Sequence, residues 1–123
     1  MYRLALYSDQ IIPENRTMDL RLMELIDVEN PKIGYVASSP DKDKFYFTPK
    51  QTYYSDLDAE LTAYTDTKNA EDEDHLENLF NCDAIHLSGG NTFFFLAWLR
   101  QTGLDMKLKE SLRQELLPTI AST

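Results

Sequence analysis

The sequence lacks most features of secreted and membrane proteins. Its 123 residues include one cysteine, Cys82, which excludes an internal disulfide and a zinc site built on several cysteines. A lone cysteine fits a reducing compartment, and we expect it to be a small, partly buried side chain. No apolar run approaches the roughly 18 residues that suggest a membrane span, and residues 1–10 are too polar for a signal peptide. We therefore expect a cytoplasmic protein with no membrane partner.

Basic residues are also scarce. The chain has 12 Lys and Arg residues against 21 Asp and Glu residues, which gives a net charge of -9. This charge repels phosphates, so we do not expect nucleic acid as a partner. Neither a metal site nor a cofactor is expected. With 42% hydrophobic and 27% charged residues the composition is globular, and the length fits a single domain over residues 1–123.

Short apolar runs alternate with segments of helical periodicity. In residues 17–26, for example, Met18, Leu22, Leu25 and Ile26 share one helical face, and Gly103 suits a left-handed helix end. The predicted strands are 2–7, 32–39, 60–65, 84–87 and 118–123, and the predicted helices are 17–26, 48–57, 69–81, 92–102 and a last one that begins near Asp105. This alternation predicts a parallel sheet with helices on both faces, a three-layer α/β/α sandwich of flavodoxin-like type.

Polar and small residues follow the predicted strands. In parallel sheets the reactive surface lies at the carboxyl ends of the strands. The residues expected there are Ser8, Asp9, Ser38, Ser39, Asp66, Gly89, Gly90, Asn91 and Ser122.

Two consecutive glycines, Gly89 and Gly90, and then Asn91 join the predicted strand 84–87 to the predicted helix 92–102. Glycine tolerates positive backbone dihedrals and leaves its N–H uncovered, so a ligand oxygen can approach it closely. The start of the following helix adds a partial positive charge at the same point. The loop is therefore a candidate anion cradle, although the same residues also form ordinary tight turns.

The segment "LENLFNCDAIHLSGGNTFFFLAWLRQTGL" (residues 76–104) resembles the Gly-Gly-Asn-Thr-Phe region of the serine peptidase family that contains dipeptidase E (aspartyl dipeptidase) and, more distantly, cyanophycinase. The resemblance in strand and helix order extends over the whole chain. It implies a sheet related to the class I glutamine amidotransferases and hydrolysis of short peptides, including Asp-X dipeptides. Gly90 N–H and Asn91 would then bind the oxyanion, and Gly89 and Thr92 the substrate.

The family's nucleophile is a serine on a sharp elbow after the fifth strand. Counting forward from Asn91 reaches Ser122, whereas the local pattern places Thr123 at that position. Ala121 stands at or beside the expected elbow glycine in either alignment. Ser122 is therefore a weak candidate nucleophile, and the chain is expected to stop at or just before the elbow.

The resemblance also implies a histidine and an acidic partner after the nucleophile, and the sequence has neither there. Its two histidines are His75, expected to be exposed, and His86, expected to be a packed structural residue on a strand. Because a serine needs a base to act as a nucleophile near pH 7, we expect the chain as given to be inactive.

A chain that stops here is expected to leave apolar surface uncovered. No later predicted helix covers the apolar residues Leu116, Leu117 and Ile120. Such surfaces favour self-association, so a homodimer is expected.

Two alternatives of other classes remain open. A flavodoxin-like core can hold a small anion at the diglycine loop without cleaving anything. A receiver-like signalling domain would use acidic residues such as Asp9 and Asp66, but it also needs a lysine on the fifth strand, which this chain lacks. A preference for aspartate would require a basic side chain in the pocket, for which Arg16 and Arg100 are the nearest candidates.

Overall fold

The computed structural model describes residues 4–7, 11–113 and 119–122, and the side chains of residues 11–111. Five strands alternate with five α-helices and one short 3-10 helix. In chain order these are β1 (Leu4–Tyr7), α1 (Arg16–Ile26), β2 (Lys32–Val36), η1 (Lys42–Lys44), α2 (Phe47–Asp56), β3 (Glu60–Thr65), α3 (Glu73–Phe80), β4 (Ala84–Leu87), α4 (Thr92–Thr102), α5 (Leu104–Arg113) and β5 (Thr119–Ser122).

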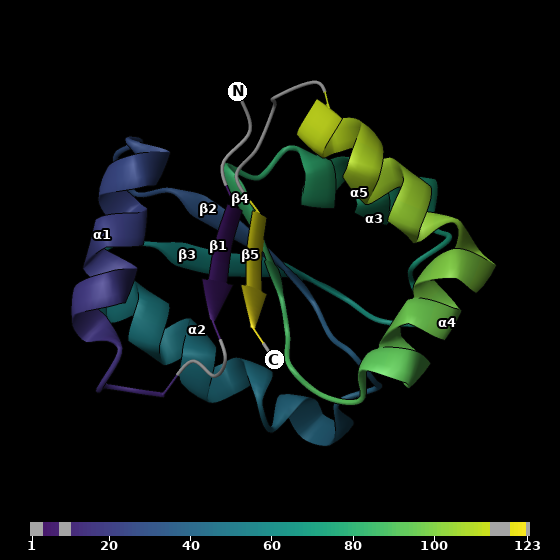
Figure 1. Ribbon diagram of the computed structural model, residues 1–123, viewed down its shortest axis with the longest axis horizontal. Coiled ribbons are helices and arrows are strands. Elements are labelled where there is room, and N and C mark those ends of the chain that lie inside the picture. Colours follow the sequence, from purple (N-terminus) through teal and green to yellow (C-terminus); the bar gives the residue numbers. More distant parts are fainter. Residues whose placement is uncertain (1–3, 8–10, 114–118, 123) are drawn as a thin grey trace.

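The strands form one parallel sheet in the order β1-β5-β4-β2-β3. In the centre, Ile33 of β2 pairs with Ala84 of β4, and the register continues to Val36 and Leu87. In Figure 1 the arrows of β1 and β5 point toward the lower edge, and α2 and α4 both begin in the lower right of the picture. The central pair β2 and β4 therefore ends next to the connections that carry the candidate site residues.

The helices cover the two faces of the sheet unequally. Figure 1 shows α1 and α2 on one side and α3, α4 and α5 on the other. Right-handed crossovers explain this division: the chain moves one way across the sheet from β1 to β2 and β3, and the opposite way from β3 to β4 and β5. The direction reverses between the neighbouring strands β2 and β4, which is where parallel sheets commonly open a crevice for ligands.

The predicted fold class, a three-layer α/β sandwich with a parallel sheet, is confirmed, and the predicted elements lie within a few residues of the observed ones. The strand order differs from the 2-1-3-4-5 order of flavodoxin itself. The acidic helix begins at Glu73 rather than at residue 69, because Asp72 caps it by accepting a hydrogen bond from His75 N. Among the described residues, no helix is long and apolar enough to cross a membrane.

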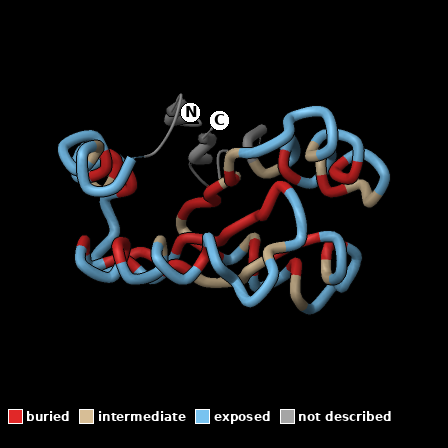
Figure 2. Tube along the Cα trace, turned by 90° about the horizontal axis from the view of Figure 1, so that it is seen from below, coloured by how far each residue is buried: buried red, intermediate tan, exposed pale blue. Residues whose placement is uncertain are grey.

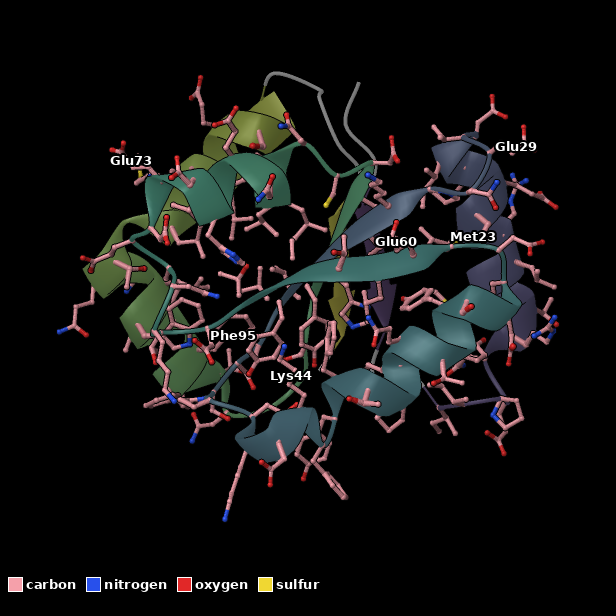
Figure 3. All side chains as sticks on the ribbon, turned by 180° about the vertical axis from the view of Figure 1, so that it is seen from behind. Met23, Glu29, Lys44, Glu60, Glu73 and Phe95 are labelled. Atoms are coloured by element: carbon pink, nitrogen blue, oxygen red, sulfur yellow. The ribbon has the colours of Figure 1, made fainter. Side chains whose placement is uncertain are left out.

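One core layer packs α1 and α2 against the sheet. It includes Leu22 and Ile26 of α1, Tyr54 of α2, and Ile33 and Tyr35 of β2. Figure 2 shows the buried residues as a continuous band along the strands, with exposed residues on the outer sides of the helices. The space between α2 and the sheet is filled by side chains (Figure 3).

The predicted apolar face of α1 is wrong in two positions. Met18 and Leu25 are exposed, whereas Asp19 is buried and its carboxylate accepts a hydrogen bond from the Tyr53 hydroxyl of α2. The aromatic partner on α2 thus turns α1 so that a carboxylate faces inward. Burial raises the pKa of Tyr53, and the hydrogen bond with Asp19 raises it further.

The second core layer packs α3, α4 and α5 against the opposite face. It includes Leu79 of α3, Ile85 of β4, Trp98 of α4 and Leu104 of α5. Cys82 lies at the edge of this layer as a buried thiol hydrogen-bonded to the Asn78 carbonyl at 3.4 Å. Burial raises the pKa of this thiol to about 11, so the thiol stays protonated at neutral pH.

His86 is the one fully buried histidine of the described residues. Its Nδ1 hydrogen-bonds with the Tyr54 hydroxyl at 2.9 Å, and its ring contacts Tyr35. Its Nε2 is buried and has no hydrogen-bond partner. Burial, with a smaller effect from the Lys50 charge, lowers the pKa of His86 to about 3. The expected structural role of His86 agrees with this setting.

The buried His86 predicts a pH-dependent stability. The folded protein holds the imidazole neutral down to about pH 3, whereas the unfolded chain binds a proton below about pH 6.5. Protonation therefore favours the unfolded state between these values. We expect His86 to lower the free energy of unfolding by about 2 kcal/mol from pH 7 to pH 5, measured by urea denaturation.

The variant His86→Asn removes the titrating ring and keeps an oxygen that can bond to the Tyr54 hydroxyl. Its stability should change less than that of the wild type over this pH interval. An unchanged slope in His86→Asn would show that other groups cause the effect.

Candidate functional site

A pocket of about 440 Å³ opens at the carboxyl ends of β2 and β4. This volume lies within the usual range for small-molecule sites. The pocket is formed by the connection that follows β2, the start of α2 and the connection that follows β4. Its lining residues are Tyr35, Ala37, Ser38, Ser39, Pro40, Asp41, Tyr46, Lys50, Ser88, Gly89 and Gly90.

Gly90 forms the pocket wall with a backbone that other residues rarely adopt. Its φ is 141°, and a Cβ at this position would overlap Ser38 Oγ and lie 3.1 Å from Ser38 Cβ. Only glycine fits without strain, because it has no side chain to place there. Neither the N–H of Gly89 nor that of Gly90 donates a hydrogen bond within the part of the chain that the structure describes. The backbone at this corner is thus accessible to a ligand oxygen.

The carbonyl of Gly89 is held by two serine hydroxyls. Ser38 Oγ donates to Gly89 O at 2.7 Å, and Ser88 Oγ donates to the same oxygen at 3.3 Å. Ser38 N donates to Ser88 Oγ at 2.8 Å, which links the two connections directly. The strand ladder continues to this point, since Ser88 N donates to Val36 O at 3.0 Å.

Helix α4 anchors the same corner from the other face of the sheet. Trp98 is buried, and its Nε1–H donates to Ser38 O at 2.8 Å. The N–H, the carbonyl and the hydroxyl of Ser38 are therefore all hydrogen-bonded. Since buried polar groups are costly to leave unpaired, this network favours one arrangement of the corner.

Asn91 begins α4 and caps it. Its Oδ1 accepts a hydrogen bond from Phe94 N at 3.0 Å, so the side-chain oxygen is used by the helix. Asn91 and Thr92 are exposed and are not among the pocket-lining residues, whereas Gly89 and Gly90 are. The structure thus brings the two glycines to the pocket, and the oxyanion and substrate roles expected for these four residues stay predictions.

Two charged side chains line the pocket, Asp41 and Lys50. Asp41 stabilises the start of α2, because its carboxylate accepts hydrogen bonds from Tyr46 N and Phe47 N at 3.0 Å each. Lys50, on α2, is half-buried and is the basic residue that the sequence analysis missed. Its position follows from the packing of α2 across β2, which no local sequence pattern indicates.

The basic residues that the sequence suggested lie elsewhere. Arg16 begins α1 and Arg100 lies in the last turn of α4, and both are exposed and do not line the pocket. Helix packing directs both side chains to solvent, and the source of an aspartate preference stays a prediction.

The described pocket contains no histidine. His86 is fully buried against Tyr35 and Tyr54 of the first core layer. His75 is half-buried on α3, where its Nε2 hydrogen-bonds with Thr65 Oγ at 2.8 Å. The expectation of an exposed His75 is thus wrong, because Thr65 at the end of β3 holds the ring. Burial raises the pKa of the pocket residue Tyr35 to about 12, so its phenol is protonated at neutral pH.

The candidate nucleophile lies on the neighbouring strand. Ala121 of β5 pairs with Leu87 of β4, which places the backbone of Ser122 one position further, level with Ser88. The side chain of Ser122 lies outside the described residues, as do Ser8, Asp9, Leu116, Leu117, Thr123 and the side chain of Ile120. The nucleophile and the dimer surface therefore stay predictions.

Other polar groups at the strand ends are occupied structurally. Asp66, after β3, is buried and accepts a hydrogen bond from Lys68 N at 2.8 Å, and Asn69 Oδ1 accepts one from Asp66 N. These bonds form a local turn. In the part of the chain that the structure describes, no group of three or more His, Cys, Asp or Glu side chains is placed to hold a metal ion.

The fold and the pocket define a parallel α/β sandwich protein whose site is built from strand-end loops and lined by two glycines. The sequence profile of peptidase family S51 matches residues 4–120. The chain belongs to peptidase family S51. The dipeptidase E-like resemblance found in the sequence is thereby confirmed, and the receiver-like alternative is not supported.

The chain is also similar to a solved structure, that of a Listeria monocytogenes EGD-e protein assigned as a peptidase E. The two superpose with a TM-score of 0.72 at 21% identity, over 99% of this chain and 59% of the Listeria chain. The chain thus spans less than two thirds of that protein, and the similarity shows the shared fold. Among curated proteins, no match is found.

The close contact between Gly90 and Ser38 predicts the effect of a side chain at this position. Gly90→Ala should reduce the free energy of unfolding by about 3 kcal/mol, since it combines backbone strain with overlap of Ser38 Oγ. Urea denaturation at pH 7 measures this change.

Gly103→Ala is the matched control. Gly103 ends α4 with φ 78°, and a Cβ there meets no atom within 4 Å. This variant should lose only about 1 kcal/mol, the cost of the left-handed backbone. Equal losses in the two variants would contradict the proposed packing of Ser38 on Gly90.

Proposed function

We propose that the pocket is the oxyanion and substrate-binding part of a serine-type exopeptidase site that acts on short peptides. The main support is Gly90, whose N–H is directed by an unusual backbone and has no acceptor among the described residues. A main-chain donor of this kind stabilises the negative oxygen that forms when a peptide carbonyl is attacked. Membership of peptidase family S51 supports the same reaction class.

The pocket also supports a substrate with a carboxylate. Lys50 is the one basic side chain among the lining residues, and the chain as a whole carries a charge of -9. Asp41 also lines the pocket, but its carboxylate is hydrogen-bonded to the backbone at the start of α2, so the Lys50 ammonium is the lining group that favours an acidic substrate group. The volume of about 440 Å³ suits a dipeptide better than a longer chain. We therefore propose Asp-X dipeptides as the substrate class and Lys50 as the residue that contacts the aspartate.

The chain as given is proposed to bind such peptides without cleaving them. A serine hydroxyl needs a nearby base, and neither histidine lines the pocket. His86 is enclosed in the core and its pKa is lowered to about 3, while His75 is held by Thr65 on the far side of β3. The chain would supply the binding half of the site, with Ser122 as the candidate nucleophile.

A non-catalytic binding module remains the second candidate. The observation that favours it is that no histidine lines the described pocket. Self-association belongs to this alternative. It is supported by two exposed aromatic side chains, Phe45 between η1 and α2 at 70% exposure and Phe93 in the first turn of α4 at 88%.

The proposal predicts selective binding of an acidic dipeptide. Asp-Leu should bind with a Kd in the millimolar range, with ¹⁵N–¹H shifts at Gly89 and Gly90, while Ala-Leu binds more weakly. Lys50→Met should weaken Asp-Leu binding roughly fivefold to tenfold, the loss of one ion pair, and leave Ala-Leu binding unchanged. Lys42→Met, an exposed lysine on η1 outside the pocket, is the control.

Hydrolysis of Asp-Leu is measured in the same samples by release of free leucine. We expect none above background. Turnover that Ser122→Ala abolishes would overturn the proposed inactivity and support the serine mechanism. Failure of Asp-Leu to shift the diglycine amides would overturn the proposed binding site.

A further inference from the structure

We infer that Ser38 and Ser88 are positioning residues, whose hydroxyls fix the peptide plane between Gly89 and Gly90 and so aim the Gly90 N–H at a substrate oxygen. The role toward a substrate rests on the proposed function. The hydrogen bonds that hold the Gly89 carbonyl do not depend on it.

The inference starts from the planarity of the peptide bond. In a trans peptide the carbonyl oxygen and the following N–H point in opposite directions. Ser38 Oγ and Ser88 Oγ both donate to Gly89 O, at 2.7 and 3.3 Å. Holding this oxygen therefore also fixes the direction of the Gly90 N–H, on the side of the peptide opposite the two hydroxyls.

The contact with Gly90 itself agrees with this direction. In a trans peptide the following Cα lies on the same side as the carbonyl oxygen. A Cβ on Gly90 would overlap Ser38 Oγ, so Ser38 covers the carbonyl side of the plane. The N–H is left on the uncovered side, and Gly90 is exposed.

A diglycine segment needs such a restraint. Glycine populates positive and negative φ with similar ease, so an unrestrained peptide between two glycines can rotate and reverse its N–H. An oxyanion donor is effective because it is oriented before the reaction. The Ser88 hydroxyl acts on its neighbour in the chain, whereas the Ser38 hydroxyl comes from the connection after β2. The stronger part of the restraint, the 2.7 Å bond from Ser38, therefore forms only when β2 and β4 pair.

The restraint is itself rigidly held. Ser38 is 7% exposed and Ser88 is 9% exposed, and Ser38 N donates to Ser88 Oγ. Trp98 Nε1–H fixes the Ser38 carbonyl. Ser39 differs from Ser38, because it lines the same pocket but is exposed, and it has no hydrogen bond to the loop among the described residues. Ser39 is therefore a matched control.

The test measures the direction and mobility of the Gly90 N–H without ligand, in the wild type and in Ser38→Ala, Ser88→Ala, the double variant and Ser39→Ala. Residual dipolar couplings report direction, and ¹⁵N relaxation order parameters report mobility. In Ser38→Ala we expect a changed coupling and an order parameter that falls from about 0.85 to below about 0.6. Ser39→Ala should match the wild type.

Well-dispersed spectra establish that each variant is folded. If Ser38→Ala does not fold, the same coupling and order parameter of Gly90 are compared between Ser88→Ala and the wild type.

A second arm titrates each variant with Asp-Leu. Ser38→Ala should weaken binding about tenfold, and Ser55→Ala, an exposed serine of α2 outside the pocket, by less than about twofold. Unchanged coupling and mobility of Gly90 in the variants would overturn the inference, and so would altered mobility with unchanged affinity. If the wild type binds no dipeptide, the proposed function fails, whereas the ligand-free measurement still decides whether the hydroxyls hold the peptide.

Discussion

The hydrogen bond from the Ser38 hydroxyl to the Gly89 carbonyl joins the two connections on which the pocket depends. It exists because β2 and β4 are parallel neighbours, which brings residues 51 positions apart to the same level of the sheet. The Ser88 hydroxyl donates a second hydrogen bond to the same carbonyl, and Trp98 of α4 donates one to the Ser38 carbonyl. Without this contact the pocket would lose one wall, since Gly90 packs directly on Ser38.

The division of the helices between the two faces of the sheet explains why the pocket lies there. The connection after β2 leaves toward α2, and the connection after β4 leaves toward α4 on the other face (Figure 1). The space between them is filled partly by Tyr35 and is bordered by Lys50. Figure 3 shows Lys44 and Phe95, which come from these two sides, near the same edge of the sheet.

The local elements could be predicted almost completely from the sequence. Strands such as β3 (Glu60–Thr65) and β4 (Ala84–Leu87) and helix α4 (Thr92–Thr102) have the predicted bounds, because apolar periodicity and the turn residues around them agree. Gly103 ends α4 in the left-handed conformation that was expected. The diglycine corner was also identified, since two glycines between a strand and a helix are unusual in an otherwise glycine-poor chain.

The features that could not be predicted depend on contacts between segments far apart in the sequence. The sequence by itself determined the fold class, the strand-to-helix junction at Gly89 and Gly90, and a resemblance to one peptidase family, because these follow from neighbouring residues. Only the tertiary structure decided that Asp19 faces inward, that Lys50 rather than Arg16 or Arg100 borders the pocket, and that the Ser38 hydroxyl bonds to the Gly89 carbonyl. Helix rotation and strand order set these contacts, and both are fixed by packing across the sheet, which short-range sequence patterns do not encode.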